Sequence, residues 1–559
     1  MALAAADTYV VVLALTEMMQ GVGVGIESLQ RATPIVSGFL LGYVAVLPLI
    51  GRLADLLDTQ RVLLGCLAVF VVGSGITALA TELPVLVAGR VVQGAGGGGL
   101  VPATLALVAA LWPPERRGMP LGLVGAVQEL GSVVGPVLGA AILAVADWRM
   151  IFWLNAIAGV VLVAALVGVG RGDAHAGGGR HTGSGGGRAD GAVWGAGLWL
   201  LGLWVLGLAL LALALAAPER LTSGVRLGVP FVPFGELQSR ITTPIGVAAL
   251  GLLVVALGLT LTRHRAVLRR ADAGGAVLIG LALGCVILTF ASAQPETQVV
   301  GPWGYLLLPL GLVCTLGYGV LHRRSNDPVI PHGVLRGRTA WALGVSFCVG
   351  VALVAVVVNI PLLARLVHTS DEAEAAFVLL RFLLAVPVGA LVGGWALRHA
   401  GEGPVAALGM ACAATGLALM TSWGEGALGS PASWVILALT GFGIGLTLAP
   451  VTNAALRPVS PGAHGAASAL VVVARMIGMV LGLALLTAIG LHRYFAIVAG
   501  LADPTNPAAL KGAAIAQLHW VFWGAAGAAA VGAACATRLG ASPSSRQRRS
   551  GLRRPVRSS

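Results

Sequence analysis

Charge is scarce in this chain of 559 residues: only 10% of its residues are Asp, Glu, Lys or Arg, whereas 57% are hydrophobic. The mean hydropathy of +0.92 lies far outside the range of globular proteins of this length. This composition excludes a water-soluble globular protein. It predicts an all-α, polytopic transmembrane protein.

Several motifs of common enzyme classes are missing from the sequence. There is no GxxxxGK[ST] phosphate loop, which argues against ATP as an energy source, and neither HExxH nor GxSxG occurs, so we expect a protein that is not an enzyme. The six cysteines lie in or beside apolar runs without CxxC spacing, so neither a disulfide framework nor a zinc site is predicted. We expect no cofactor and no bound metal, and an ion gradient as the energy source. The His- and Gly-containing stretch 171–193 is interpreted as a flexible linker rather than a metal site.

Apolar runs long enough to cross a bilayer fall into three groups. A helix needs about 20 apolar residues to span the hydrocarbon core. The first six runs are 2–27, 34–50, 62–80, 84–111, 119–146 and 150–170. Four inserted runs follow at 194–217, 244–262, 273–293 and 302–321. The last six are 339–366, 375–397, 405–423, 432–456, 464–491 and 513–537. Sixteen spans are therefore predicted, and omitting the pair 194–217 and 244–262 would leave fourteen.

This order predicts two six-helix halves separated by an insertion, the layout of a duplicated transporter. The expected segments are an N-terminal half, a cytoplasmic linker, the inserted helices, a second cytoplasmic linker, a C-terminal half and a basic cytoplasmic tail, at 1–170, 171–193, 194–321, 322–338, 339–537 and 538–559.

The basic residues predict the orientation of the chain. Of the 35 Lys and Arg, 24 fall on the side of the predicted N-terminus, eight fall in loops on the other side, and Arg90, Arg381 and Arg475 lie within spans. Cytoplasmic loops carry an excess of Lys and Arg, so both termini are expected in the cytoplasm and the protein in the inner (plasma) membrane. The net charge of +13 follows from these short loops, which argues against nucleic-acid binding.

Three charged residues stand out within the apolar runs: Asp7, Glu129 and Arg475. An ionisable group at membrane depth is costly unless it faces a cavity or a partner, and such groups mark proton relays and substrate paths. Arg475 needs an anionic partner, for which Asp7 and Glu129 are the candidates. A carboxylate that alternates between an arginine and a proton would couple proton entry to a conformational change. Only six residues, about 9 Å of helix, precede Asp7, so either the chain starts upstream of Met1 or Glu17 is the deeper acid.

The turn after the second span, from Gly51 to Arg61, reads GRLADLLDTQR. Its glycine allows two helices to approach closely, and Asp55 can brace an inner gate against a helix N-terminus or an arginine. The turn resembles the G-x-L-A-D signature of the major facilitator superfamily. It departs from that signature at Asp58, where glycine is usual. A solvated polar turn is the alternative interpretation.

Two further stretches resemble motifs of the same superfamily. Residues 90–96 (RVVQGAG) match its R-x-x-Q-G-x-G element, in which the arginine, here Arg90, is associated with proton coupling; snorkelling of Arg90 to the interface is the alternative. Gly131, Gly135, Pro136 and Gly139 match the antiporter motif G-x-x-x-G-P-x-x-G-G, with alanine in place of its last glycine. The glycines recur every four residues, so they predict a stripe for close helix packing, with Glu129 off that stripe and free to face a cavity or to bond Gln128.

Longer stretches resemble one group within that superfamily, the mycobacterial triacylglyceride and multidrug exporters that work beside a lipid-carrying lipoprotein. They are residues 7–12, 126–136, 147–149 and 471–482. The resemblance implies a drug:proton-antiporter-like fold and roles for Asp7, Glu129 and Arg475. It departs from the group in having four inserted helices where two are usual.

We therefore expect a proton-coupled exporter of amphipathic or apolar compounds, drugs or lipids such as triacylglycerides, that works by alternating access. Its partners would be a small-molecule or lipid substrate, protons, membrane lipids and a periplasmic lipoprotein. A proton-linked importer and a membrane-embedded lipid-modifying enzyme are the alternatives. The first would need more polar and aromatic residues along the spans, and the second a catalytic constellation that the sequence does not show.

Overall fold

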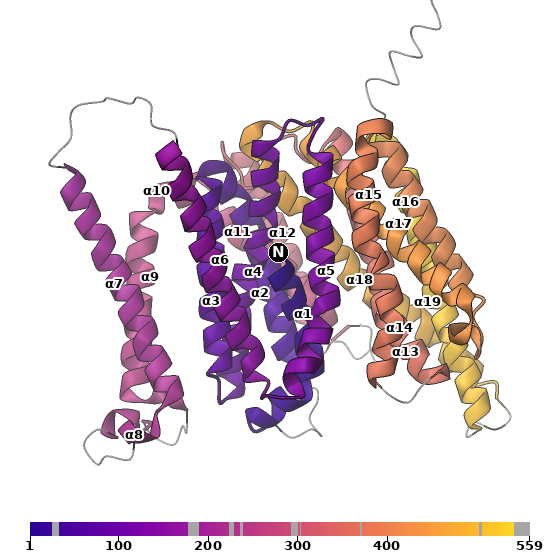
Figure 1. The fold of residues 1–559 in the computed structure, drawn as a ribbon, viewed down its shortest axis with the longest axis horizontal. Coiled ribbons are helices and arrows are strands. Elements are labelled where there is room, and N and C mark those ends of the chain that lie inside the picture. The colour runs from indigo at the N-terminus through magenta and orange to yellow at the C-terminus, as the bar shows by residue number, and fades with distance from the viewer. Residues whose placement is uncertain are drawn as a thin grey trace, which may run out of the picture.

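The computed structural model describes residues 1–24, 33–176, 189–222, 228–234, 239–291, 300–301, 303–368, 372–501, 503 and 506–540. Within these residues all regular structure is helical, and the helices stand side by side as a broad bundle (Figure 1). Fifteen of the described helices are long and apolar enough to cross a membrane. The all-α polytopic fold predicted from composition is confirmed.

Six helices form the N-terminal half. They are α1 (Ala2–Gly21), α2 (Thr33–Leu56), α3 (Thr59–Ala78), α4 (Leu83–Leu111), α5 (Gly118–Leu143) and α6 (Arg149–Ala176). Helix α4 packs against both α2 and α3, α1 packs against α5, and α3 packs against α6. Helix α4 can approach its neighbours closely because its glycines leave no side chain in the way: a Cβ on Gly99, for example, would overlap the Cys66 thiol of α3.

The C-terminal half is built from seven helices. They are α13 (Gly337–Val367), α14 (Glu372–Leu383), α15 (Ala385–Ala400), α16 (Glu402–Met420), α17 (Pro431–Leu456), α18 (His464–Val498) and α19 (Pro507–Ala536). The predicted span 375–397 is thus divided between α14 and α15 at Leu384. Pro387 explains the break, because it has no N–H to donate to the carbonyl of Leu383 four residues earlier.

Among the described residues, the insertion contributes four long helices and four shorter elements. The long ones are α7 (Ala189–Ala216), α9 (Pro244–Arg263), α11 (Ala273–Ala291) and α12 (Gly304–Arg324). The shorter ones include α8 (Glu219–Thr222) and α10 (Arg265–Arg270). Helices α7 and α9 pair with each other at the edge of the N-terminal half, whereas α11 packs on α2 and α12 packs on α11 (Figure 1). Both α7 and α9 are among the fifteen helices of spanning length, which favours the larger of the two predicted numbers of spans.

Helix α1 corresponds to the first predicted span, 2–27. It has 20 residues, but it is not among the fifteen helices that are long and apolar enough to cross a membrane. It lies within the bundle against α5, so Met1 is found near the middle of the molecule (Figure 1).

The two halves meet mainly along two pairs of helices, α2 with α18 and α5 with α15, and also contact each other through α4 with α18 and α5 with α17. Glycines lie at both main crossings. A Cβ on Gly51 of α2 would come within 2.6 Å of the Gly465 carbonyl oxygen of α18, and one on Gly118 of α5 would come within 2.5 Å of the Gly394 carbonyl oxygen of α15. Backbones this close leave no room for a side chain. The halves are therefore in tight contact at the end of the bundle where α2 ends and α5 begins.

Candidate functional site

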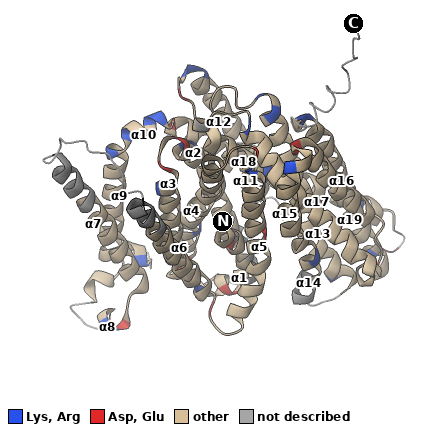
Figure 2. Ribbon diagram, turned by 45° about the horizontal axis from the view of Figure 1, so that its top comes forward, with Lys and Arg blue, Asp and Glu red and all other residues tan. Residues whose placement is uncertain are grey.

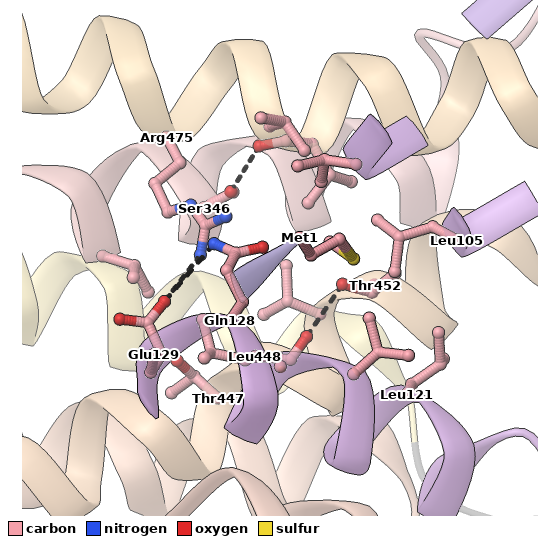
Figure 3. Close-up of a pocket in the computed structure, with 17 residues that line it drawn as sticks. Met1, Leu105, Leu121, Gln128, Glu129, Ser346, Thr447, Leu448, Thr452 and Arg475 are labelled. Carbon is pink, nitrogen blue, oxygen red and sulfur yellow. Dashed lines mark hydrogen bonds and ion pairs between the residues drawn. The ribbon is translucent and has the colours of Figure 1, made fainter. Parts of the chain in front are cut away.

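Glu129 and Arg475 face each other across the contact between the halves (Figure 3). Glu129 comes from α5 and Arg475 from α18, and the Glu129 Oε1 to Arg475 Nη1 distance is 3.9 Å. Their side chains are about 10% and 12% exposed, so neither is sealed off. The Gln128 side-chain amide also donates to Glu129 Oε1, at 3.5 Å. These distances are long for charge-assisted hydrogen bonds, so Glu129 is held loosely.

Two small cavities adjoin this pair, with volumes of about 40 and 80 Å³, and both are lined by Glu129, Arg475 and Gln128. Most of the other lining residues are aliphatic, with a few hydroxyl groups such as those of Ser346 and Thr447. Volumes of this size hold a few water molecules. In this conformation the centre of the molecule is therefore closed to a large cargo but has room for water beside the Glu129 carboxylate.

Asp7 lies elsewhere in the N-terminal half and is held tightly. Its carboxylate forms an ion pair with Arg90 of α4, and accepts hydrogen bonds from the side-chain amides of Gln93 (2.9 Å) and Asn155 (2.6 Å). The Asp7 side chain is fully buried, whereas Glu17, the alternative deep acid, is exposed on α1. All three partners donate, and the two oxygens of the Asp7 carboxylate accept all three hydrogen bonds.

Arg90 is enclosed by the same network and does not reach towards an interface. It is 1% exposed, and its guanidinium carbon lies 4.4 Å from the centre of the Phe39 ring. Its Nη1 also donates to the side-chain oxygen of Gln93 (2.6 Å), and its Nε to the carbonyl of Ile35 (3.3 Å). The alternative interpretation of Arg90 as a snorkelling residue does not fit this position.

The structure therefore brings Arg475 together with one of its two candidate partners. Glu129 is the carboxylate beside Arg475, and Asp7 is paired with Arg90 instead. Sequence reasoning missed Asn155 as a partner of Asp7. Asn155 could have been singled out in the sequence, because it is a lone side-chain amide within the apolar span of α6.

The glycine stripe of α5, formed by Gly131, Gly135 and Gly139, packs against α1, which carries Asp7. A Cβ on Gly131 would overlap the backbone of Ala2, one on Gly135 would come within 2.5 Å of the Ala6 carbonyl oxygen, and one on Gly139 would lie 3.1 Å from Val10. Pro136 lies inside the same helix. As predicted from the four-residue repeat, Glu129 points away from this stripe, into the cavity. The stripe thus joins the helix of Asp7 to the helix of Glu129.

Asp55 ties the two halves together at the end of α2. Its carboxylate accepts hydrogen bonds from the backbone N–H groups of Gly465 (2.6 Å) and Ala466 (3.0 Å), which lie in the first turn of α18. Free N–H groups and the helix dipole make a helix N-terminus a favourable place for a carboxylate. The nearby Arg52 donates to the carbonyl of Gly462 at 3.3 Å. The sequence suggested either a helix N-terminus or an arginine as the partner of Asp55. The structure shows hydrogen bonds to the helix N-terminus.

Arg61 is exposed at the start of α3, and its backbone N–H donates to the Asp58 carboxylate at 3.0 Å. Asp58 is thus the N-cap of α3, which gives a physical reason for an acid where glycine is usual in the signature.

A second polar cluster, at the start of α16, lies within the C-terminal half and was not predicted. Glu402 is 2% exposed and accepts from Arg457 (3.0 Å), Asn453 (3.0 Å) and Arg338 (3.2 Å). It links the first turn of α16 to α13 and to the end of α17, and so holds this half together as a unit.

Within the described residues, no three His, Cys, Asp or Glu side chains come together in a way that could hold a metal ion.

The sequence is similar to known membrane transporters over most of its length. The sequence model of the Major Facilitator Superfamily matches residues 1–322 and 322–483. A triacylglyceride transporter of Mycolicibacterium hassiacum is 36% identical over 504 residues, which are 88% of this chain and 78% of that protein. A triacylglyceride transporter of Mycobacterium tuberculosis is 33% identical over 530 residues, 92% of this chain and 85% of that protein.

Among solved structures, the proton:xylose symporter XylE has a similar fold. The TM-score is 0.51 at 12% identity, with 95% of this chain and 92% of that chain covered. At this identity the likeness concerns the fold alone.

Proposed function

Because this chain belongs to the major facilitator superfamily, we propose that it is a proton-coupled exporter of apolar or amphipathic compounds, working by alternating access. The family makes it a multi-pass membrane transporter. Export, proton coupling and the nature of the cargo are the proposal. The observation that carries it is the loose ion pair of Glu129 and Arg475 beside the central cavities, where the two halves meet.

The coupling step follows from the chemistry of this pair. Arginine stays protonated, whereas a carboxylate can take up a proton. When Glu129 is ionised, its attraction to Arg475 holds α5 of one half near α18 of the other. When a proton neutralises Glu129, that attraction is lost and the halves can separate around the cavity. A proton thus favours one conformation over the other, which is the requirement for coupling.

Asp7 and Arg90 have a supporting role in this proposal. Their network is buried and fully satisfied, so in this conformation it fixes α1, α4 and α6 relative to one another. A second proton at Asp7 would require this network to open in another conformation. The glycine stripe transmits any such movement of α1 directly to α5.

The proposed cargo class rests on the cavity walls and on the relatives. Residues such as Val101, Leu121 and Leu448 give the cavity mainly aliphatic walls, which suit apolar molecules. The relatives named above are called triacylglyceride transporters, so lipids of this class, and amphipathic drugs of similar character, are the proposed cargo. We propose a lipid-carrying lipoprotein as the acceptor on the outer side.

The proposed location is the plasma membrane, with both termini in the cytoplasm. Figure 2 shows Lys and Arg gathered mainly at the end of the bundle that carries α10, which contains Arg265, Arg269 and Arg270. This is the side that the positive-inside rule assigns to the cytoplasm. Asp55 and the start of α18 lie at the same end by chain order, so the gate that they close would be the cytoplasmic one.

The proposal is tested with purified protein in liposomes. A fluorescent amphipathic dye and a labelled triacylglyceride are followed under an imposed proton gradient, with wild type compared with Glu129→Gln. We expect gradient-driven movement of at least one cargo in the wild type, reduced to the level of empty liposomes in the variant. The neighbouring variant Gln128→Ala, which changes the same cavity without removing a charge, is expected to retain coupling.

Two outcomes would favour the alternatives. Uptake in the same direction as the proton, instead of opposite to it, would indicate a symporter and therefore an importer. Chemical conversion of the lipid without any gradient would indicate an enzyme. Coupled transport that survives both Glu129→Gln and Asp7→Asn would remove these acids from the mechanism.

A further inference from the structure

The segment between α12 and α13, residues 325–336, crosses the end of the bundle where the Asp55 gate lies; we refer to it as the strap. A segment that only connects two helices is usually exposed and polar. Here Val329 is 1% exposed, Val334 5% and Ile330 9%, although the segment has no regular secondary structure. Burial of three apolar side chains from one linker indicates that the strap is part of the packed structure.

The hydrophobic cluster that these side chains join includes residues of both halves of the molecule. The hydrophobic cluster that contains Val329, Ile330 and Val334 also contains residues of α4 in the N-terminal half, of α17 and α18 and the turn between them in the C-terminal half, and of the inserted helix α11. These are Ala109, Leu456, Ala463, Ala467 and Ala276. The strap therefore lies along the contact between the two halves, which we call the seam. The halves would have to separate along this seam for the gate to open.

Polar contacts fix the backbone of the strap to the inserted helices. The N–H of Val329 donates to Asp272 Oδ2 at 3.1 Å, and the N–H of Ile330 donates to the Tyr318 hydroxyl at 3.3 Å. Asp272 also caps α11, since its Oδ1 accepts from the N–H of Gly275 at 3.1 Å. The strap is thus held in one register by groups that belong to the insertion.

The insertion reaches the same seam a second time through α11. This helix packs on α2, where a Cβ on Gly280 would lie 2.9 Å from the Ala45 carbonyl oxygen. Ile287 of α11 is 4% exposed and lies in a cluster with Tyr43 of α2 and Val473 of α18. Helix α11 therefore contacts both halves along the α2 and α18 pair.

We propose that the strap and α11 form a latch that holds the gate at the Asp55 end closed, and that the insertion sets the balance between the two conformations of the transporter. If the halves separate at this end, the strap can follow only one of them. The strap then loses its contacts with the other half. Apolar surface becomes exposed on Val329, Ile330 or Val334, or on the half from which the strap has separated. The closed gate is stabilised by the burial of that surface.

The latch is tested by measuring how far the gate opens, in the absence of cargo. Spin labels are placed on cysteines introduced at Leu57 and Ser460, which are exposed positions on opposite sides of the gate, in a background without the six native cysteines. Double electron–electron resonance in lipid nanodiscs gives the distribution of distances. The test variant is Val329→Ser with Val334→Ser, and the matched control is Leu335→Ser, whose side chain is 51% exposed in the same strap.

We expect the double variant to raise the ratio of open to closed gates about tenfold, because two buried apolar side chains lose their packing. Leu335→Ser should match the wild type. Tyr318→Phe, which removes only the hydroxyl that accepts from the Ile330 N–H, should shift the ratio in the same direction by a smaller factor. Tyr318→Phe also provides a readout if the double variant fails to fold.

A distance distribution equal to that of the wild type in the folded variants would overturn the latch. An equal shift in Leu335→Ser would overturn it as well, because any change in the strap would then have the same effect. Since no cargo or proton gradient enters this measurement, its outcome is independent of whether the protein exports lipids.

Discussion

At the scale of single residues, the two buried acids differ in how they are held. Asp7 is fully buried among Arg90, Gln93 and Asn155, whereas Glu129 lines a cavity 3.9 Å from Arg475. Removal of one partner from a buried ion pair leaves an uncompensated charge, which costs far more than the pair itself contributes. The same substitution of acid by amide should therefore have different effects on stability at the two positions.

Asp7→Asn should destabilise the protein by about 3–5 kcal/mol, the usual cost of a buried pair that loses one charge. Glu129→Gln should leave the melting temperature near that of the wild type, because water in the cavities can solvate Arg475. Thermal unfolding in detergent measures both variants. The double variant Asp7→Asn with Arg90→Gln should recover part of the lost stability. Equal melting temperatures for the two single variants would contradict this assignment.

Burial arguments on the sequence identified Asp7, Glu129 and Arg475, because a charge within an apolar run is conspicuous. They could not decide which acid meets Arg475. Arg90 and Asp7 are separated by 83 positions, and Arg475 and Glu129 lie in different halves. Pairing at such separations depends on how the helices pack, which hydropathy does not report. Asn155 was overlooked because a neutral amide changes the hydropathy of a span only slightly.

At the scale of helices, the glycine stripe on α5 predicts a position-specific effect of a single methyl group. Gly131→Ala would overlap the backbone of Ala2 on α1, whereas on Gly125 of the same helix the added carbon would lie at an ordinary 3.7 Å from its nearest neighbour, Leu448. Overpacking of a tight contact usually costs about 1–3 kcal/mol. Gly131→Ala should lower the melting temperature, and Gly125→Ala should not. An unchanged melting temperature for Gly131→Ala would mean that α1 and α5 are farther apart than in this structure.

The gate at the end of α2 gives a second prediction for helices. Asp55→Ala removes the acceptor of two N–H groups at the start of α18, a loss of about 1–3 kcal/mol for the closed gate. The ratio of open to closed gates should rise roughly five- to 140-fold, since each 1.4 kcal/mol is about tenfold. Labelling of a cysteine placed on the cavity wall by a membrane-impermeant reagent, applied from the cytoplasmic side, measures this. Asp58→Ala, which alters only the N-cap of α3, is the control; equal labelling of the two variants would exclude a gating role for Asp55.

The helices also mark where prediction from sequence ends. The apolar runs fixed the location of the spans because burial in lipid requires about 20 apolar residues in any fold. The division of 375–397 into α14 and α15 was missed although Pro387 signals it. The strap could not be predicted, because Val329, Ile330 and Val334 do not form an apolar run and only the tertiary contacts show them to be buried.

At the scale of the whole molecule, the two halves meet mainly along α2 with α18 and α5 with α15, and charged groups link the halves at two places. Asp55 fixes the first of them at one end, and Glu129 bridges from α5 to Arg475 of α18 at the centre. The small size of the central cavities means that a lipid can enter only after the halves move. A transporter of this design exchanges a closed gate for an open cavity, and the proton at Glu129 is proposed to decide between them.

The most direct test of this account is proton movement driven by cargo. Purified protein is reconstituted in liposomes that contain a pH-sensitive dye, without an imposed gradient, and a cargo that the protein transports is added on one side. We predict a pH change inside the wild-type liposomes, opposite in direction to the cargo flux, and no change above background with Glu129→Gln. Cargo movement in the wild type without any proton movement, or an unaltered pH change in Glu129→Gln, would contradict the central claim that Glu129 carries the coupled proton.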